Sequence, residues 1–214
     1  MARTNVASSR SDVAWTTDQP NWNRVNAQRN LFPPQMWKDI GAATDGTSNT
    51  IAGGEIVTTP GEGSLLAKGT VVIRDATPRP QICLDVRDPA KSGQVKETET
   101  IHSEYNRGHY FSSPLLQFSG FCTILPPNSP NCTGGAGWND GTFSASSYHT
   151  GGVNVSFLDG SVQFISETIG TGDLTFPTPG YCLQVEPKKM PTDSQYGVWG
   201  ALGTPAGGES KGLP

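Results

Sequence analysis

His149 and Asp159, with nine residues between them, are the first two residues of this chain to be considered for chemistry. A histidine beside a carboxylate can act as a general base or help to hold a metal ion. Asp45 and Glu55 supply two further carboxylates. A hydrolase or metal-dependent enzyme centred on His149 requires at least one of these three acidic groups within hydrogen-bonding reach of the imidazole.

The segment from Ser146 to Ser166, SSYHTGGVNVSFLDGSVQFIS, predicts the β-hairpin that must position this pair. Asp159-Gly160 favours a two-residue type I′ turn, since both central residues of such a turn need positive φ. That loop pairs Leu158 with Ser161 and leaves Ile165 on a mixed outer face. It predicts one continuous apolar face, made of Val153, Val155, Phe157, Val162 and Phe164.

The hairpin also argues against a catalytic pair. Asp is favoured at a hairpin tip because it tolerates positive φ, without any catalytic requirement. His149 precedes the first strand and is expected near the opposite end of the hairpin from Asp159. A structural role for His149, capping a loop or binding the backbone, is therefore favoured over a metal or protonation role.

The block Asp45-Gly46-Thr47-Ser48-Asn49-Thr50 is dense in side-chain oxygens. Asx and Ser/Thr turns use such residues to end one element and begin the next. A calcium site would need six to eight oxygen ligands, and Asp45 and Glu55 are the two carboxylates nearby. We therefore predict a turn and no metal site, with a structural motif made of His149, Asp159, Gly160, Asp45, Gly46, Asn49 and Glu55.

The histidines and the glycine pairs do not form the usual catalytic or phosphate-binding patterns. The three histidines, His102, His109 and His149, form no H-E-x-x-H pair. The glycine pairs do not follow the phosphate-binding pattern. We predict a protein that is not an enzyme and has no cofactor.

Composition favours loops and short strands over long helices. Gly 26 and Pro 17 make about a fifth of the 214 residues, against roughly one-eighth on average. The net charge of −4 is spread along the chain and implies neither nucleic acid nor an anionic membrane as partner. We predict an irregular segment at 1–30, a β-rich head domain at 31–186 and a Pro/Gly-rich tail at 187–214.

Within the head, the sequence predicts three further strands and one exposed excursion. The strands are Thr50 to Thr58, interrupted by a bulge or close approach at Gly53-Gly54, then Gly69 to Arg74 and Phe121 to Leu125. The polar stretch from Asp75 to Tyr110 is expected to be exposed. The fold class is thus α+β and β-rich, with an antiparallel sheet that contains the hairpin at about 153–166 and long loops.

Four cysteines, Cys83, Cys122, Cys132 and Cys182, lack the C-x-x-C spacing of a zinc or redox site. Two disulfides in an oxidising compartment are the better interpretation. Four cysteines allow three connectivities. Local closure of Cys122 with Cys132, across a proline-rich turn, is one of them.

Several short blocks resemble one bacterial family in the same order. His149 followed by nine residues and Asp159-Gly160 resembles the domain family named for its prepilin-type, processing-associated H-X9-DG motif. DGTSNTI at Asp45 followed by Glu55, RG at Arg107, LPPNSPNC at Leu125, and YGVWGALGTPAGGE at Tyr196 resemble its other blocks. The resemblance spans about four-fifths of the chain.

That resemblance implies a pilin-like head at the bacterial cell surface. Members of the family usually begin with a prepilin-like leader and a long apolar helix. The opening MARTNVASSRSDVAW offers nothing like the roughly 20 apolar residues of a membrane anchor. We therefore expect a soluble head, made by truncation, processing or natural variation, with an extracellular, cell-surface or periplasmic location. Membrane contact is expected only through an N-terminal helix absent from this chain.

The resemblance also bears on the disulfides. Cys83 and Cys132 lie in blocks that resemble the family's own cysteine positions, whereas Cys122 and Cys182 look like additions. It therefore implies bridges of Cys83 with Cys132 and of Cys122 with Cys182.

The function that the resemblance implies is a non-catalytic structural subunit of a pilin-like or pseudopilin-like filament or secretion apparatus. Its partners are expected to be copies of itself and other pilin-like subunits. The segment from Tyr196 to Glu209, with Trp199, is a candidate flexible contact arm. The alternative is a secreted carbohydrate-binding module that uses surface aromatics, the candidates being Trp37, Trp138, Tyr148 and Trp199.

Overall fold

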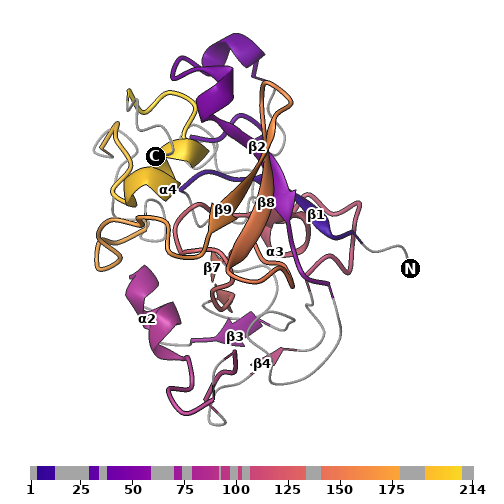
Figure 1. The fold of residues 1–214 in the computed structure, drawn as a ribbon, viewed down its shortest axis with the longest axis vertical. Helices are drawn as coiled ribbons and strands as arrows, with labels where there is room; N and C mark the ends of the chain where they lie inside the picture. The colour runs from indigo at the N-terminus through magenta and orange to yellow at the C-terminus, as the bar shows by residue number, and fades with distance from the viewer. Residues whose placement is uncertain are drawn as a thin grey trace.

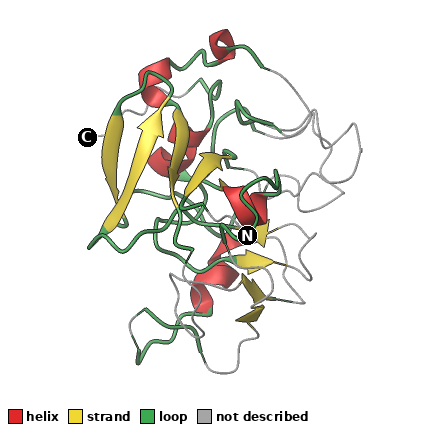
Figure 2. Ribbon diagram, turned by 90° about the vertical axis from the view of Figure 1, so that its right-hand side faces the viewer, coloured by secondary structure: helices red, strands yellow, loops and turns green. Residues whose placement is uncertain are grey.

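The computed structural model shows an α+β, strand-rich fold, as the sequence predicts. It describes residues 4–12, 29–33, 38–58, 70–73, 79–91, 93–96, 101–102, 107–133, 141–178 and 191–208. In these ranges the strands form two sheets with short helices around them (Figures 1 and 2). The likeness to a pilin head stays a prediction.

The larger sheet has five strands in the order β5-β1-β2-β8-β9. They are β1 (Val6–Ser9), β2 (Ile51–Glu55), β5 (Gly120–Phe121), β8 (Gly152–Phe157) and β9 (Val162–Ser166). All neighbours are antiparallel except β1 and β5, which run parallel. The sheet is therefore mixed, whereas the sequence predicts an antiparallel one. The strand predicted at Thr50 to Thr58 is present in shorter form as β2. The strand predicted at Phe121 to Leu125 is wrong beyond Phe121, because β5 ends there.

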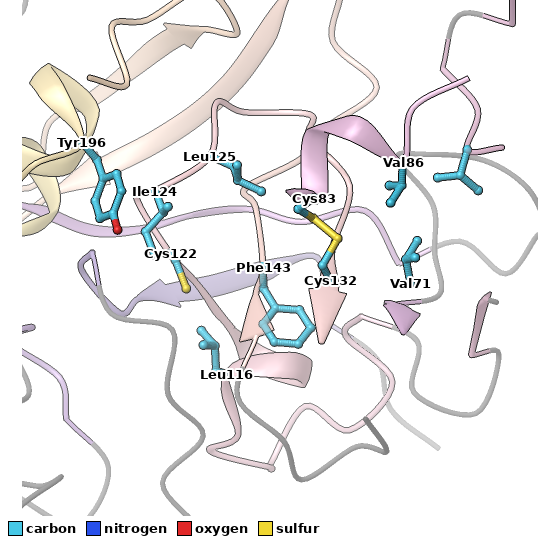
Figure 3. Packing of buried hydrophobic residues seen from close by; sticks show 11 residues of the cluster. Val71, Cys83, Val86, Leu116, Cys122, Ile124, Leu125, Cys132, Phe143 and Tyr196 are labelled. Atoms are coloured by element: carbon cyan, nitrogen blue, oxygen red, sulfur yellow. A yellow bond between two sulfur atoms is a disulfide. The ribbon is translucent and has the colours of Figure 1, made fainter. Parts of the chain in front are cut away.

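The smaller sheet has four short strands in the order β4-β3-β6-β7. They are β3 (Thr70–Val72), β4 (Ile101–His102), β6 (Cys132–Thr133) and β7 (Gly141–Thr142). Helix α2 (Pro80–Asp85) is tied to β6 by the disulfide between Cys83 and Cys132 (Figure 3). The prediction of an exposed excursion is wrong for this part, because Cys83 and Val86 are buried.

Two glycines let β2 lie close to its neighbours. A Cβ atom on Gly54 would lie 3.1 Å from Val155 and 3.2 Å from the Phe121 ring. The register between β2 and β8 also shifts between Ile51 and Gly53. The bulge or close approach predicted at this glycine pair is thus present in both forms.

Helix α4 (Gly197–Gly203) packs against the larger sheet. Trp199 is fully buried, stacks on Phe121 at a centroid distance of 6.4 Å and donates its Nε1–H to the carbonyl of Leu125 at 2.9 Å. The hypothesis of a flexible contact arm is therefore wrong for Trp199. A large aromatic with a satisfied indole N–H belongs to the core.

The hairpin is present, but its register differs from the prediction by one residue. Val153 pairs with Ile165, and Val155 pairs with Gln163. The N–H of Phe157 donates to Ser161 O, and the N–H of Gly160 donates to Phe157 O, so the loop has three residues. Gly160 has φ of +86°, and Asp159 is not among the described residues with positive φ. The predicted type I′ turn is thus wrong, and the structure has a three-residue loop with glycine in the left-handed region.

The shift turns two predicted core residues outward. Val162 is 66% exposed and Phe164 is 51% exposed, while Ile165 is buried. A one-residue change in register moves every side chain of a strand to the other face. The Asp159 carboxylate contributes to the longer loop, because it accepts hydrogen bonds from the N–H and hydroxyl of Ser161 at 2.9 and 2.7 Å.

Candidate functional site

Glu55, at the end of β2, meets the loop that leads into the hairpin. Its Oε1 lies 3.2 Å from Nε2 of His149. Its Oε2 accepts the backbone N–H of Asn154 at 2.8 Å, and the side-chain amide of Asn154 lies 3.3 Å from both oxygens. The carboxylate therefore joins β2, β8 and the His149 loop at one point. We call Glu55, His149, Asn154, Ser147 and Asn128 the Glu55 junction.

Ser147 and Asn128 hold the loop of this junction. The Ser147 hydroxyl donates to Gly152 O at 2.7 Å and accepts the N–H of His149 at 3.0 Å. Asn128 Oδ1 accepts the N–H of Ser147 at 2.9 Å. Asn128 itself has φ of +62°, a conformation that Asn tolerates better than most residues. These hydrogen bonds hold the backbone of His149 and so fix the position of its side chain.

The junction opens to solvent on two sides of Tyr148 and His149. A hollow of about 340 Å³ lies on one side, with Asn5 and Ser146 in its wall. A second hollow of about 740 Å³ lies on the other side, where Arg87 joins the wall. The side chain of His149 is 56% exposed and that of Glu55 is 29% exposed. The imidazole is thus accessible, whereas the carboxylate is half-buried behind it.

The arrangement meets one condition for an enzyme, and the serine hydroxyl beside it is bound to the backbone. Glu55 does lie within hydrogen-bonding reach of His149, the convergence that a hydrolase requires. The nearby Ser147 hydroxyl, however, donates to Gly152 O. Within the described residues no three His, Cys, Asp or Glu side chains converge to hold a metal ion. What the geometry visibly does is bind segments of the chain together.

Asp45 lies in a separate contact with the C-terminal part of the chain. Its carboxylate accepts the backbone N–H groups of Gly207 and Gly208 at 2.7 and 3.1 Å. The predicted turn is present as a short 3-10 helix, η2 (Thr47–Asn49), preceded by Gly46 with φ of +99°. Asn49 donates its side-chain amide to Asp45 O at 3.0 Å. The Asp45 carboxylate and the Asn49 amide are therefore bound to the chain's own backbone.

Asp159 lies at the hairpin tip and contacts the same block through its backbone. The N–H of Asp159 donates to Thr47 O at 3.2 Å, and the N–H of Leu158 donates to Thr50 O at 3.0 Å. Hydrogen bonds from Ser161 lower the pKa of the Asp159 carboxyl below its ordinary value. The hairpin tip and the Asp45 block thus form one connected structural unit.

Arg107 is a buried residue whose role the sequence interpretation missed. It is 1% exposed, and its Nη1 donates to Leu116 O and Gln117 O, both at 2.8 Å. Its guanidinium lies 5.3 Å from the centre of the Phe143 ring. Burial lowers the pKa of Arg107 to about 9. The sequence shows the Arg107-Gly108 block but does not indicate that the arginine is buried, because arginine is rarely buried. Its burial is evident only from its contacts in the fold.

The cysteines settle part of the predicted connectivity. Cys83 bonds to Cys132, which excludes closure of Cys122 with Cys132. Cys122 is buried next to Phe143 in the core (Figure 3), and burial raises the pKa of a thiol at this position to about 12. Cys182 lies outside the described residues, so its pairing with Cys122 stays a prediction.

Two of the four aromatics named for a carbohydrate-binding module, Trp199 and Tyr148, are described, and they do not share an exposed surface. Trp199 is buried, whereas Tyr148 is 65% exposed. Trp37 and Trp138 lie outside the described residues. This alternative therefore gains no support from the described part of the chain.

Comparison with known proteins places the chain in a family. Residues 4–172 match SBP_bac_10, described as a protein of unknown function (DUF1559), and the chain belongs to this family. The family is associated with prepilin-like proteins. No curated protein and no solved structure matches the chain. Among the described residues, no helix has both the length and the apolar character needed to cross a membrane.

Proposed function

We propose that this protein is a non-catalytic structural subunit of a pilin-like or pseudopilin-like cell-surface filament or secretion apparatus, and that it works by self-association. Membership of a family associated with prepilin-like proteins supports this class. The disulfide between Cys83 and Cys132 supports an extracellular, cell-surface or periplasmic location, because disulfides persist in oxidising compartments.

The outer face of β9 is the observation that carries the proposal. Val162 and Phe164 expose 66% and 51% of their surface on the outermost strand of the larger sheet. No residue of β9 carries a charge. Edge strands of monomeric proteins are usually protected by charges, prolines or bulges. An uncharged edge with exposed apolar side chains is a feature that self-association would use.

The motif residues support a structural role in place of a catalytic one. Glu55 binds the N–H of Asn154, Asp45 binds the N–H of Gly207, and Asn128 binds the N–H of Ser147. Each interaction joins segments that are distant in sequence. These side chains of the family blocks thus accept hydrogen bonds from backbone N–H groups of the fold itself.

Sedimentation velocity and electron microscopy of the full chain test the proposal. We expect assemblies that grow with protein concentration and that weaken in a Phe164→Ser variant. Phe111, which is 57% exposed, provides the matched control, and Phe111→Ser should assemble like the parent. The same series with reductant shows whether assembly needs the disulfide. A chain that stays monomeric at every concentration contradicts the proposal.

A further inference from the structure

On the outer edge of β9, the backbone groups of Val162 and Phe164 have no hydrogen-bond partner among the described residues. Ser161 and Glu167 are both hydrogen-bonded to the β8 side, through Phe157 and Gly151 respectively. Residues of an antiparallel strand alternate between the two edges, so Gln163 and Ile165 also face β8. The N–H and C=O groups of Val162, Phe164 and Ser166 therefore point away from the sheet, and of these Ser166 O accepts the N–H of Ile169 at 3.1 Å. β9 is the last strand in the order of the larger sheet (Figure 1).

The side chains of the same residues lie on the exposed face. Val162, Phe164 and Ser166 are all exposed, in contrast to Ile165, which is buried. Phe164 lies over β8, since a Cβ atom on Gly152 would come within 2.8 Å of its ring. One side of the ring thus packs against Gly152, and the rest of the ring is exposed to solvent. Backbone groups and apolar side chains are offered together along one edge.

We propose that β9 pairs antiparallel with β9 of a second copy, around a two-fold axis at Phe164. The inference rests on the proposed self-association and names its contact. The outward-facing residues are spaced symmetrically about Phe164, so Phe164 opposes itself and Val162 opposes Ser166 of the second copy. The two copies of Phe164 then exchange both of their backbone hydrogen bonds, and the two Phe164 rings meet on one face.

The charges along β9 permit a second copy as the occupant. The paired segments carry no charge, so copies meet without repulsion along the strand itself. Glu167 of each copy approaches the hairpin tip of the other, where Asp159 lies. These exposed acidic groups repel weakly, and added salt should therefore strengthen the contact.

The contact is small and closes on itself. The contact involves one five-residue strand from each copy. The surface area that it buries should lie below roughly 1,200 Å², the lower end of the range for stable interfaces. The contact should therefore be weak in solution and stronger where other contacts hold copies together, because local concentration is then high. A two-fold contact gives a dimer, so a growing assembly would need a second surface as well.

Cysteine cross-linking of the full chain tests the pairing and its register. Directly opposed residues of a hydrogen-bonded pair have Cα atoms about 5.5 Å apart, within the range of a disulfide. Phe164→Cys should therefore form covalent dimers under mild oxidation, on a non-reducing gel. Val162→Cys alone should not, since its two copies would lie about 13 Å apart. The double variant Val162→Cys/Ser166→Cys should cross-link and retains the Phe164 ring.

The outcomes separate this inference from the proposed function. Absence of cross-linking in both Phe164→Cys and the double variant overturns the pairing, as does equal cross-linking by Val162→Cys or by the parent chain. Larger assemblies without these cross-links would overturn the pairing and leave the structural function standing. Specific cross-linking without assemblies larger than a dimer would support the pairing and contradict the filament subunit. Phe164→Lys, with an unchanged circular dichroism spectrum, should reduce dimer formation by the double variant several-fold.

Discussion

Glu55 Oε1 and His149 Nε2 lie 3.2 Å apart although the two residues are 94 positions apart in the sequence. The contact links the end of β2 to the loop that opens the hairpin. The other oxygen of Glu55 accepts the N–H of Asn154 in β8. The histidine of the H-X9-DG spacing is therefore held by a carboxylate whose second bond is part of the sheet.

The two partners of this pair should contribute unequally to stability. Glu55→Ala leaves the half-buried N–H of Asn154 without its acceptor, which costs about 1 to 3 kcal/mol. His149→Ala removes an exposed partner, and such pairs contribute about 0 to 1 kcal/mol. Urea unfolding of both variants measures the difference. Glu167→Ala is the control, because it removes an exposed acidic residue from the wall of the 740 Å³ hollow beside His149. This variant should change stability little. A larger loss for His149→Ala than for Glu55→Ala would contradict this account.

Asp45 should fix the position of the segment that follows α4. Its carboxylate accepts the N–H groups of Gly207 and Gly208, and hydrogen bonds to charged groups are stronger than neutral ones. Asp45→Ala should destabilise the fold by about 1 to 3 kcal/mol. Hydrogen exchange at Gly207 and Gly208 should also become faster. Exposed Asp39 has no side-chain capping bond, so Asp39→Ala should leave exchange at these glycines unchanged.

Gly160 should be required for its backbone conformation alone. Its φ is +86°, and a Cβ atom there would meet nothing within 4 Å. Gly160→Ala should therefore destabilise the protein by about 1 kcal/mol through strain in the left-handed region. Gly170 also has open space, without positive φ, so Gly170→Ala is the matched control and should be neutral or slightly stabilising. Equal effects of the two substitutions on thermal unfolding would show that φ is not the cause.

The hairpin shows how far local sequence determines the fold. Asp159-Gly160 between alternating apolar runs is sufficient to predict two paired strands. It does not determine the register, because a two-residue and a three-residue loop both accept glycine at positive φ. The side-chain bonds from Ser161 to Asp159 and the burial of Ile165 accompany the longer loop. The outward position of Val162 and Phe164 follows from this choice, and their alternating pattern did not predict it.

The Glu55 junction was predictable only in its parts. The sequence identified His149 and Glu55 as candidates and favoured a structural role for the histidine. Their contact depends on the pairing of β2 with β8, a long-range arrangement that no local spacing specifies. Trp199 shows the same limit. The glycine-rich sequence around it predicts a tail, whereas in the structure this segment is a helix and Trp199 packs against Phe121 in the core.

Cys122 should behave as a protected thiol. It is 1% exposed, and burial raises its pKa to about 12. The thiolate is the reactive form of cysteine. A Cys182→Ser variant leaves Cys122 as the one thiol outside the Cys83–Cys132 disulfide. We expect no reaction with a thiol reagent at pH 8 in the folded state and one reactive thiol per chain after unfolding. Reaction of the folded variant at the rate of the unfolded one would contradict the burial of this group.

The raised pKa of Cys122 also predicts how stability changes with pH. The folded value of about 12 lies above the ordinary value of 9.0, so the unfolded chain loses this proton first as pH rises. The contribution of the thiol to stability is therefore complete below about pH 9 and is lost progressively as pH rises toward 12. Urea unfolding of the Cys182→Ser variant between pH 8 and 11 should show this loss. Adding Cys122→Ala to that variant provides the control, and its stability should fall less steeply over the same range. Parallel pH profiles for the two chains would show that the buried thiol does not titrate as this environment requires.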